Sequence, residues 1–524
     1  MAGWQRPMKL SRQVIVSGVV QLILLLFLCD RAGACTAEER EALLSFLAEL
    51  SPRPGDGIAA SWRGSPDCCT WDGVSCGGDG AVARLWLPRR GLGGTISPAV
   101  ANLTALTHLN LSGNSLDGAF PAALLSLPNA AIVDVSYNRL SGSLPDLSPP
   151  VGLGGLALPL QVLDMSSNAL AGPFPSVIWE HTPSLVSLNA SNNSLGGLIP
   201  SFCVSSPALA VLDLSVNQFG GGIPPGFGNC SQLRVLSVGR NNLTGELPDD
   251  LFDVKPLQRL LLPWNQIQGT LDPERIAKLV NLVALDLGSN AFTGELPESI
   301  SQLPKLEELR LGHNNLTGTL PPALSNWTGL RCLDLRSNSF VGDLDAVDFS
   351  GLGNLTIFDM ASNNFTGTMP PSIYSCTSLK ALRVGNNQIE GQVAPEIGNL
   401  HQLQFLSLTI NSFTNISGMF WNLQGCNNLT ALLVSYNFYG EALPDAGWVG
   451  DHVSNVRLLV MGNCQLTGQI PSWLSKLQDL NILVLAGNRL TGPIPSWLGS
   501  MKKLYYLDLP WQASTQATCH CHSP

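Results

Sequence analysis

A pattern of leucines that repeats about every 24 residues constrains this chain more than any other feature of its sequence. The clearest copies are LEELRLGHNNLTGTLP at 306–321 and LVALDLGSNAFTGELP at 282–297. Both follow the pattern L-x-x-L-x-L-x-x-N-x-L-x-G-x-(I/L)-P, which recurs from Val82 to Leu509. A unit this short cannot bury its apolar side alone, so the copies are expected to stack on one another as a solenoid.

The residue at the asparagine position sets the register of the copies. We count seventeen complete copies and a fragment of an eighteenth, with Arg90 at this position in the first copy and Cys464 in the sixteenth. The leucines should point inward, and the asparagine side chain should bond backbone groups that the tight turn leaves unpaired. Cys464 is expected to be a small buried residue in place of the asparagine. The asparagines are Asn114, Asn138, Asn168, Asn193, Asn217, Asn241, Asn265, Asn290, Asn314, Asn338, Asn363, Asn387, Asn411, Asn437 and Asn488.

Two further features of the repeat concern its backbone. The glycine before the (I/L)-P pair permits a conformation that is closed to other residues, and the proline fixes φ where the chain leaves the coil. One copy is lengthened by the insertion PDLSPPVGLGGLALP at 145–159, which we expect to form a surface loop.

The first 34 residues predict a secretory signal peptide. Arg6, Lys9 and Arg12 precede the apolar run 14–28, and Ala-Gly-Ala at 32–34 forms an A-x-A cleavage site. The alternative is a signal anchor, although about 15 apolar residues fall short of the roughly 20 that a membrane span needs. No later run is a candidate span, because polar residues interrupt every apolar stretch at the repeat spacing.

Residues 35–81 predict a cap for the first coil. The segment TAEEREALLSFLAEL has apolar residues at helical spacing behind an acidic first turn. Cys35, Cys68, Cys69 and Cys76 form an even set that favours two disulfides in an oxidising compartment. We expect Cys35–Cys68 and Cys69–Cys76, although four cysteines allow three pairings, and a zinc site is the alternative.

Six further cysteines occur singly within the repeats, and we expect them to be buried free thiols. They are Cys203, Cys230, Cys332, Cys376, Cys426 and Cys464.

Twelve N-x-S/T sequons are typical of a secreted glycoprotein. Asn110 and Asn189 lie at strand positions of the inner face, where a glycan would be crowded, and Asn192 is a third sequon beside them. The nine sequons predicted as glycosylation sites are Asn102, Asn229, Asn242, Asn315, Asn326, Asn354, Asn364, Asn415 and Asn428.

Charge and motif content exclude several functions. The net charge of −10 argues against a nucleic-acid partner, because binding phosphates requires a positive surface. No nucleophile, base or metal constellation converges, and the motifs of a protein kinase are absent from the sequence. The sequence therefore predicts a binding protein that is not an enzyme, with no cofactor and no metal.

The cap and the repeats together resemble the extracellular part of plant leucine-rich-repeat receptor kinases. The resemblance rests on SWRGSPDCCTWDGVSC at 61–76 and on the T-G-x-(I/L)-P ending of the repeats. Within that group, GEALPD at 440–445, LTGQIPSWLSKL at 466–477 and LAGNRLTGPIPSWLGSMKKLYYLDL at 485–509 look like phytosulfokine receptors and the related tyrosine-sulfated glycopeptide receptors. The resemblance covers residues 35–509.

This resemblance implies an α/β repeat solenoid, the plant-type leucine-rich-repeat superhelix with a disulfide cap at its N-terminus. Receptors of this kind continue with more repeats, an island segment, a membrane span and a serine/threonine kinase. Here the repeats at 82–509 give way to the non-repeat tail PWQASTQATCHCHSP at 510–524. We therefore expect a truncated form that does not signal and has lost one wall of the hormone site.

The variable strand positions of a solenoid line its concave face, which is the usual binding surface. Arg310, Arg336 and Arg383 would form a basic stripe there, and guanidinium groups bind sulfate or carboxylate through two parallel hydrogen bonds. A solvated charged face is the alternative, since Glu307 and Glu308 lie alongside. The resemblance places Arg336, Ser407, Thr409 and Ser435 at the repeat positions that hold the peptide in phytosulfokine receptors.

Two functions follow from the sequence. The first is the extracellular ligand-binding region of a receptor, which binds a peptide hormone together with a co-receptor kinase; a tyrosine-sulfated peptide is the candidate ligand. The second is a secreted repeat module, an inhibitor or an immune receptor-like protein, that binds another protein through the same face. A count of seventeen copies favours the receptor, since the inhibitors have near ten. Both functions predict the secretory pathway and a place outside the cell or on the outer face of the plasma membrane.

Overall fold

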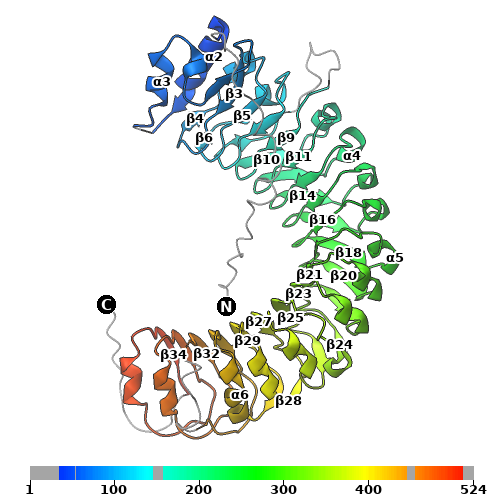
Figure 1. Cartoon of the computed structure of the whole chain (residues 1–524), viewed down its shortest axis with the longest axis vertical. Helices are drawn as coiled ribbons and strands as arrows, with labels where there is room; N and C mark the ends of the chain where they lie inside the picture. The colour runs from blue at the N-terminus through cyan, green and yellow to red at the C-terminus, as the bar shows by residue number, and fades with distance from the viewer. Residues whose placement is uncertain (1–34, 54, 146–156, 445–454, 511–524) are drawn as a thin grey trace.

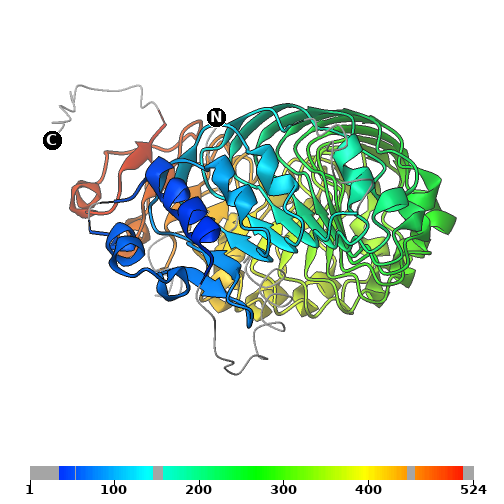
Figure 2. The same ribbon diagram turned by 90° about the horizontal axis from the view of Figure 1, so that it is seen from above.

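The computed structural model describes residues 35–53, 55–145, 157–444 and 455–510. These residues form one curved solenoid with the cap at one end (Figure 1). The coils stack side by side along the arc, as the view from above shows (Figure 2). The predicted signal peptide, residues 146–156 of the insertion and residues 511–524 of the tail lie outside the described residues.

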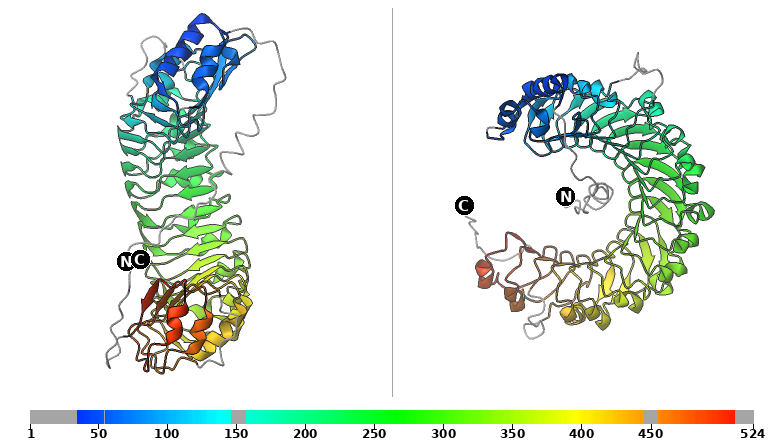
Figure 3. Two further views of the ribbon diagram at one scale, coloured as in Figure 1. Left: turned by 90° about the vertical axis from the view of Figure 1, so that its left-hand side faces the viewer. Right: turned by 45° about the horizontal axis from the view of Figure 1, so that its top comes forward.

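One parallel strand from each copy forms the inner sheet, which lines the concave side of the arc (Figure 3). Neighbouring strands pair in register, so Leu309 lies beside Leu285 on one side and Leu333 on the other. β2 (Val74–Cys76), from the cap, joins the first strand in antiparallel orientation. The predicted solenoid is confirmed. In chain order the parallel strands are β3 (Val82–Trp86), β5 (His108–Asn110), β7 (Ile132–Asp134), β9 (Val162–Asp164), β11 (Ser187–Asn189), β13 (Val211–Asp213), β15 (Val235–Ser237), β17 (Arg259–Leu261), β19 (Ala284–Asp286), β21 (Glu308–Arg310), β23 (Cys332–Asp334), β25 (Ile357–Asp359), β27 (Ala381–Arg383), β29 (Phe405–Ser407), β31 (Ala431–Leu433), β32 (Leu458–Val460), β33 (Ile482–Val484) and β34 (Tyr506–Asp508).

A second series of short strands runs along one flank of the coils, directly after each asparagine position. Eight pair in sequence, namely β8 (Ser141–Gly142), β10 (Ala169–Pro173), β12 (Ser194–Gly197), β14 (Gln218–Gly221), β16 (Asn242–Gly245), β18 (Gln266–Thr270), β20 (Ala291–Glu295) and β22 (Asn315–Thr317). Smaller groups are β1 (Leu50–Ser51) with β4 (Gly93–Thr95) and β6 (Ser115–Asp117), β24 (Val341–Asp343) with β26 (Asn364–Thr366), and β28 (Glu390–Gln392) with β30 (Ser412–Thr414).

The outer side of the arc carries short helical turns that return the chain to the next strand (Figure 3). Most are single 3₁₀ turns, which a sequence rich in proline favours at their first positions. The α-helical ones are α4 (Phe202–Ser205), α5 (Pro273–Ile276) and α6 (Ile416–Asn422). The 3₁₀ turns are η2 (Pro98–Asn102), η3 (Ala122–Leu125), η4 (Val177–His181), η5 (Phe227–Asn229), η6 (Asp249–Asp253), η7 (Glu298–Gln302), η8 (Pro322–Asn326), η9 (Leu344–Ala346), η10 (Pro371–Ser375), η11 (Pro395–Asn399), η12 (Leu423–Gly425), η14 (Ser472–Lys476) and η15 (Ser496–Ser500).

The asparagine side chains link consecutive coils, as the sequence predicted. Asn314 is representative: its Nδ2 donates to the carbonyls of Leu287 and Leu311 at 3.0 and 2.9 Å, and its Oδ1 accepts from the N–H of Phe292 at 3.0 Å. Two of these three backbone groups belong to the preceding coil. Cys464 takes the same place with weaker sulfur contacts, 3.5 Å to the Val434 carbonyl and 3.3 Å to that of Gly462. We call this stack of side chains the asparagine ladder.

The residue just before each ladder position has left-handed backbone geometry. Fifteen of these residues in the described chain are not glycine, and their φ angles lie between 52° and 60°. Such values are rare outside glycine and are strained for β-branched residues such as Val216 and Ile410. The turn that presents the ladder side chain therefore also turns its neighbour outward at the rim of the concave face.

The cap closes the first coil through a buried carboxylate. α2 (Ala37–Glu49) begins with a capping box between Thr36 and Glu39, and Oε1 of Glu39 also accepts from the N–H of Val82 at 2.8 Å. Behind α2, α3 (Ile58–Gly64) buries Trp62, whose ring stacks on that of Trp71. The first strand of the solenoid is thus bonded to the cap helix.

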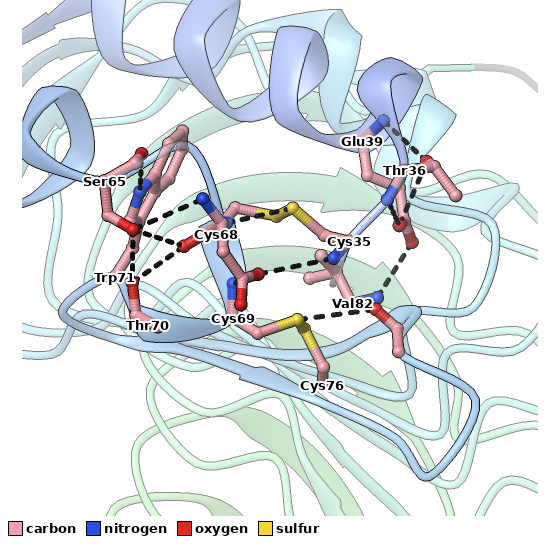
Figure 4. The surroundings of a disulfide bond; sticks show 12 residues. Cys35, Thr36, Glu39, Ser65, Cys68, Cys69, Thr70, Trp71, Cys76 and Val82 are labelled. Carbon is pink, nitrogen blue, oxygen red and sulfur yellow. Dashed lines mark hydrogen bonds between the residues drawn. A yellow bond between two sulfur atoms is a disulfide. The ribbon is translucent and has the colours of Figure 1, made fainter. Parts of the chain in front are cut away.

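Both predicted disulfides of the cap are confirmed. Cys35 joins Cys68, and Cys69, within η1 (Cys68–Thr70), joins Cys76 on β2 (Figure 4). The zinc alternative falls away, because all four sulfur atoms are bonded in pairs. Arg90, at the asparagine position of the first copy, turns toward this cap and forms ion pairs with Asp56 at 2.9 Å and Asp72 at 2.6 Å.

One expectation about the cysteines is wrong. Cys203 in α4 and Cys230 after η5 form a disulfide, with their Cα atoms 4.8 Å apart. They are 27 residues apart, close to one repeat, so both lie on the outer turns of neighbouring coils. Cys332, Cys376, Cys426 and Cys464 are buried free thiols, as expected.

The ladder predicts a large effect from one polar substitution. We expect Asn387→Ala to lower the free energy of unfolding by about 2–4 kcal/mol, because it leaves the Met360 and Val384 carbonyls and the Phe365 N–H without partners. Asn387→Cys should cost less, since Cys464 fills the equivalent place. Urea unfolding measures the change. The exposed neighbour provides the control: Gln388→Ala should stay near wild type, and equal losses at both positions would contradict the role of the ladder.

Candidate ligand-binding face

The concave face presents the outward side chains of the inner strands in rows that run along the arc. Register fixes the central row, in which each residue lies beside its counterpart in the next coil. Strand side chains alternate between the core and this face, so the leucines between them are buried. From β5 onward the central row reads Asn110, Asp134, Asp164, Asn189, Asp213, Ser237, Leu261, Asp286, Arg310, Asp334, Asp359, Arg383, Ser407, Leu433, Val460, Val484 and Asp508.

The structure brings two of the three predicted arginines together around one carboxylate. Asp359, which is 2% exposed, lies 3.6 Å from Nη1 of Arg336 and 3.2 Å from Nη1 of Arg383. Arg336 also pairs with Asp334 at 3.4 Å. We call these residues, with Arg310 and its partner Glu308, the mixed-charge cluster. The row is therefore of mixed charge rather than purely basic.

Burial shapes the electrostatics of this cluster. It raises the pKa of Asp334 to about 6, against the opposing effect of Arg336. The guanidinium of Arg383 also lies over the ring of Phe405, 4.6 Å from its centre. The Nε atoms of Arg336 and Arg383 are buried without hydrogen-bond partners. A ligand on this face would therefore meet the two arginines through their terminal nitrogens, since the side chains are 37% and 39% exposed.

The three predicted hydroxyl residues differ in how free they are. Ser407 lies in the central row next to Arg383 and is half-buried. Oγ1 of Thr409 is buried without a hydrogen-bond partner. Ser435 is already used by the fold, because its Oγ accepts from the N–H of Gly462 at 3.0 Å. Of the three, Ser407 is the hydroxyl that a ligand on this face can reach, since Oγ1 of Thr409 is buried.

The concave face becomes apolar directly after Ser407, which the sequence analysis did not anticipate. The central row continues with Leu433, Val460 and Val484, all half-buried, and the row beside it with Leu458 and Ile482. In the central row the earlier coils carry aspartate, asparagine, serine or arginine at this place, except at Leu261. The row beside it is apolar in several earlier coils as well, as at Val211 and Ile357. Comparing one repeat position across all copies would have shown the change. The predicted site therefore lies where a mixed-charge surface meets an apolar one.

Comparison with known proteins agrees with the fold. The family model of the leucine-rich-repeat N-terminal domain matches residues 36–77. Models of the leucine-rich repeat match eight single copies between residues 105 and 501, such as 208–230, and a pair of copies at 304–349. Receptor-like protein 3 of Arabidopsis thaliana is 39% identical over 485 residues, which are 91% of this chain and 64% of that protein. The chain is a leucine-rich-repeat protein with the N-terminal cap of that family, and it is similar to receptor-like proteins of plants.

Two further similarities concern ligand-binding receptors. Phytosulfokine receptor 1 of Arabidopsis thaliana is 37% identical over 113 residues, which are 21% of this chain and 11% of that protein. The crystal structure of the Arabidopsis receptor kinase HAESA with the peptide hormone IDA and the co-receptor SERK1 is 26% identical. It superimposes with a TM-score of 0.63 and covers 90% of each chain.

The nine sequon asparagines predicted to carry glycans are all exposed. They lie on the flank strands, as Asn242 and Asn315 do, or on the outer turns, as Asn102 does. Asn110 and Asn189 are instead engaged on the concave face, where their Nδ2 atoms donate to Asp134 at 3.2 Å and Asp164 at 3.1 Å.

We expect Asn110 and Asn189 to remain unmodified when the chain is made in a glycosylating cell. Each amide is held between neighbouring coils, so a transferase cannot reach it once the chain has folded. Mass spectrometry after enzymatic deglycosylation reports the conversion of each modified asparagine to aspartate. Asn315 serves as the exposed comparison, and full occupancy at Asn110 would contradict the expectation.

A pair of aspartates predicts how stability depends on pH. Asp134 and Asp164 are neighbours in the central row, and burial together with Asp134 raises the pKa of Asp164 from 3.8 to about 6. The folded chain therefore holds a proton that the unfolded chain releases near pH 4. The contribution of protonated Asp164 to the free energy of unfolding is therefore present at pH 4 and is lost as the pH rises through 6.

Asp164→Asn should abolish that loss. We expect the substitution to raise the free energy of unfolding by about 1–2 kcal/mol at pH 7.5 and to change it little at pH 4.5. An amide at 164 would donate to Asp134 as Asn110 does from the other side. Denaturant titrations at both pH values check this, with Asp117→Asn, an exposed aspartate on β6, as control. A benefit at 164 that is the same at both pH values would exclude the titration as its cause.

Proposed function

We propose that this chain is the ligand-binding extracellular region of a receptor-like protein that holds a peptide on its concave face between β21 and β31. The observation that carries the proposal is the boundary at Arg383 and Ser407, where paired charges give way to an apolar surface. A peptide with an acidic group beside apolar residues fits such a boundary, because each part meets a complementary surface.

The similarity to receptors supports a peptide as the ligand. HAESA, which shares this fold over most of both chains, was crystallised with a peptide hormone and a co-receptor. Receptor-like protein 3, the relative that matches over 91% of the chain, is longer, and the chain spans 64% of its length. A co-receptor kinase is accordingly part of the proposal, as is a function that consists of binding without catalysis.

Tyrosine sulfation of the peptide is the finer part of the proposal. A sulfate ester offers the oxygen geometry that guanidinium groups bind through two hydrogen bonds. The side chains of Arg336 and Arg383 are 37% and 39% exposed, and Ser407 lies next to Arg383. The partial similarity to phytosulfokine receptor 1 supports the same chemistry.

The cellular location completes the proposal. The chain would enter the secretory pathway through residues 1–34, and the three disulfides of the structure suit an oxidising compartment. Within the described residues, no helix has the length and apolar character that crossing a membrane requires. We therefore place the folded region outside the cell or on the outer face of the plasma membrane.

Phytosulfokine and its unsulfated form provide the test. The sulfated peptide should bind more tightly in calorimetry, and Arg383→Gln or Arg336→Gln should each weaken it about tenfold. Asp359→Asn should strengthen binding, because it releases both guanidinium groups from their shared partner. The matched control is Arg139→Gln, an exposed arginine on the flank that should change nothing.

Thermal unfolding of each variant separates lost binding from lost structure. This matters because Arg383→Gln leaves the carboxylate of Asp359 buried with fewer partners. Equal affinity for the sulfated and unsulfated peptides, or weaker binding in Asp359→Asn, would contradict the proposed sulfate site.

A further inference from the structure

Three arginines on the concave face stand apart from the mixed-charge cluster because nothing in the described chain neutralises them. Arg234, Arg240 and Arg259 form no ion pair and no side-chain hydrogen bond with any described residue. Arg310, Arg331, Arg336 and Arg383, by contrast, each lie against a carboxylate. The outward positions of β15 and β17 also contain no acidic residue.

These arginines occupy opposite edges of two neighbouring coils. Arg234 and Arg259 lie where β15 and β17 begin, and the N–H of Arg259 donates to the Arg234 carbonyl at 2.9 Å. Arg240 follows β15 at the rim, with left-handed geometry and a φ of 57°. Arg234 and Arg240 are six residues apart on one coil, so the two edges are separated by at most roughly 20 Å.

An aromatic ring fixes the guanidinium at the rim. The central carbon of the Arg240 guanidinium lies over the indole of Trp264, 5.1 Å from the ring centre. Trp264 is itself 44% exposed and left-handed at φ 60°. The contact holds the guanidinium in place while leaving its N–H groups open to solvent. It also leaves part of the indole free to contact an apolar side chain.

The strand segments between the edges are uncharged. They consist of Val235, Ser237, Gly239, Leu261 and Pro263, of which Ser237 and Gly239 are buried. A side chain at Gly239 would meet Pro263 at 2.7 Å, so the two coils pack closely against each other here. On either side of the two coils the central row returns to aspartate, at Asp213 and Asp286.

We propose that Arg234, Arg259, Arg240 and Trp264, the guanidinium band, form a docking site for an extended acidic peptide segment that lies across the two coils. A small anion cannot reach both edges at once. An extended chain can, with one acidic group at Arg234 and Arg259 and another at Arg240. A long polyanion such as a nucleic acid fits poorly, because Asp213, Asp286 and a net charge of −10 repel it.

The guanidinium band is independent of the proposed sulfate site. Arg259 on β17 and Arg383 on β27 are separated by five strand spacings, which is about 24 Å along the sheet. One ligand could cover both places, or two ligands could bind separately. The inference stands if the sulfate site fails, since none of its residues is shared.

A synthetic acidic peptide serves as the probe. It has roughly eight residues, with glutamates at both ends and glycine and serine between them, and spans about 26 Å when extended. A matched peptide carries glutamine in place of glutamate. By fluorescence anisotropy the acidic peptide should bind the chain more tightly than its neutral match, and salt should weaken the binding.

Variants assign the binding to the guanidinium band. Arg234→Gln, Arg240→Gln and Arg259→Gln should each weaken the acidic peptide about three- to tenfold. Arg139→Gln should leave its affinity unchanged. Each variant's urea midpoint should stay near that of the wild type, because these arginines make no bond that the fold needs.

Three results would overturn the proposal. Equal affinity for the acidic and neutral peptides would show that charge is not recognised. An equal loss in Arg139→Gln and Arg259→Gln would show that charge matters but not its place. Tighter binding of a single-stranded oligonucleotide than of the acidic peptide would assign the surface to polyanions in general.

Discussion

The buried asparagine amide is the interaction on which the rest of the solenoid depends. Strands of three residues give too few hydrogen bonds to hold two coils together. Asn314 adds bonds to two backbone groups of the preceding coil and one of its own, in a place sealed by leucines. Because the amide both donates and accepts, no apolar side chain can replace it. The spacing of about 24 residues is the length of chain that returns each amide to the same place.

Much of the fold could be predicted because each repeat position has one physical role. The leucines, ladder asparagines and cap cysteines are where the sequence placed them. The Cys203–Cys230 disulfide was missed because the two residues occupy different offsets in their copies. Comparing equivalent positions of neighbouring copies does not bring these two residues together. Only the path of the outer turns shows that the two side chains meet.

The binding face was harder to predict, since a list of arginines does not show which are neutralised. Asp334, Asp359 and Arg383 hold the same repeat position, so the alternation of charge was available from register. That Arg336 reaches across to Asp359 depends on a side-chain conformation. Arg234 and Arg259 were overlooked because nothing in their own positions distinguishes them from the predicted arginines. They differ because no carboxylate lies beside them.

The left-handed residues before the ladder positions affect which side chains can occupy the rim of the concave face. Glycine would relieve the backbone there, yet only Gly113 and Gly487 supply it among these places in the described chain. A β-branched side chain such as Ile410 is held in a conformation that it disfavours by roughly 1–2 kcal/mol. That side chain is 44% exposed, so the fold gains less from it than from a fully buried leucine. At the rim, therefore, folding favours glycine but does not require the side chains that are present. Differences between related proteins at these positions would reflect the ligands that they bind.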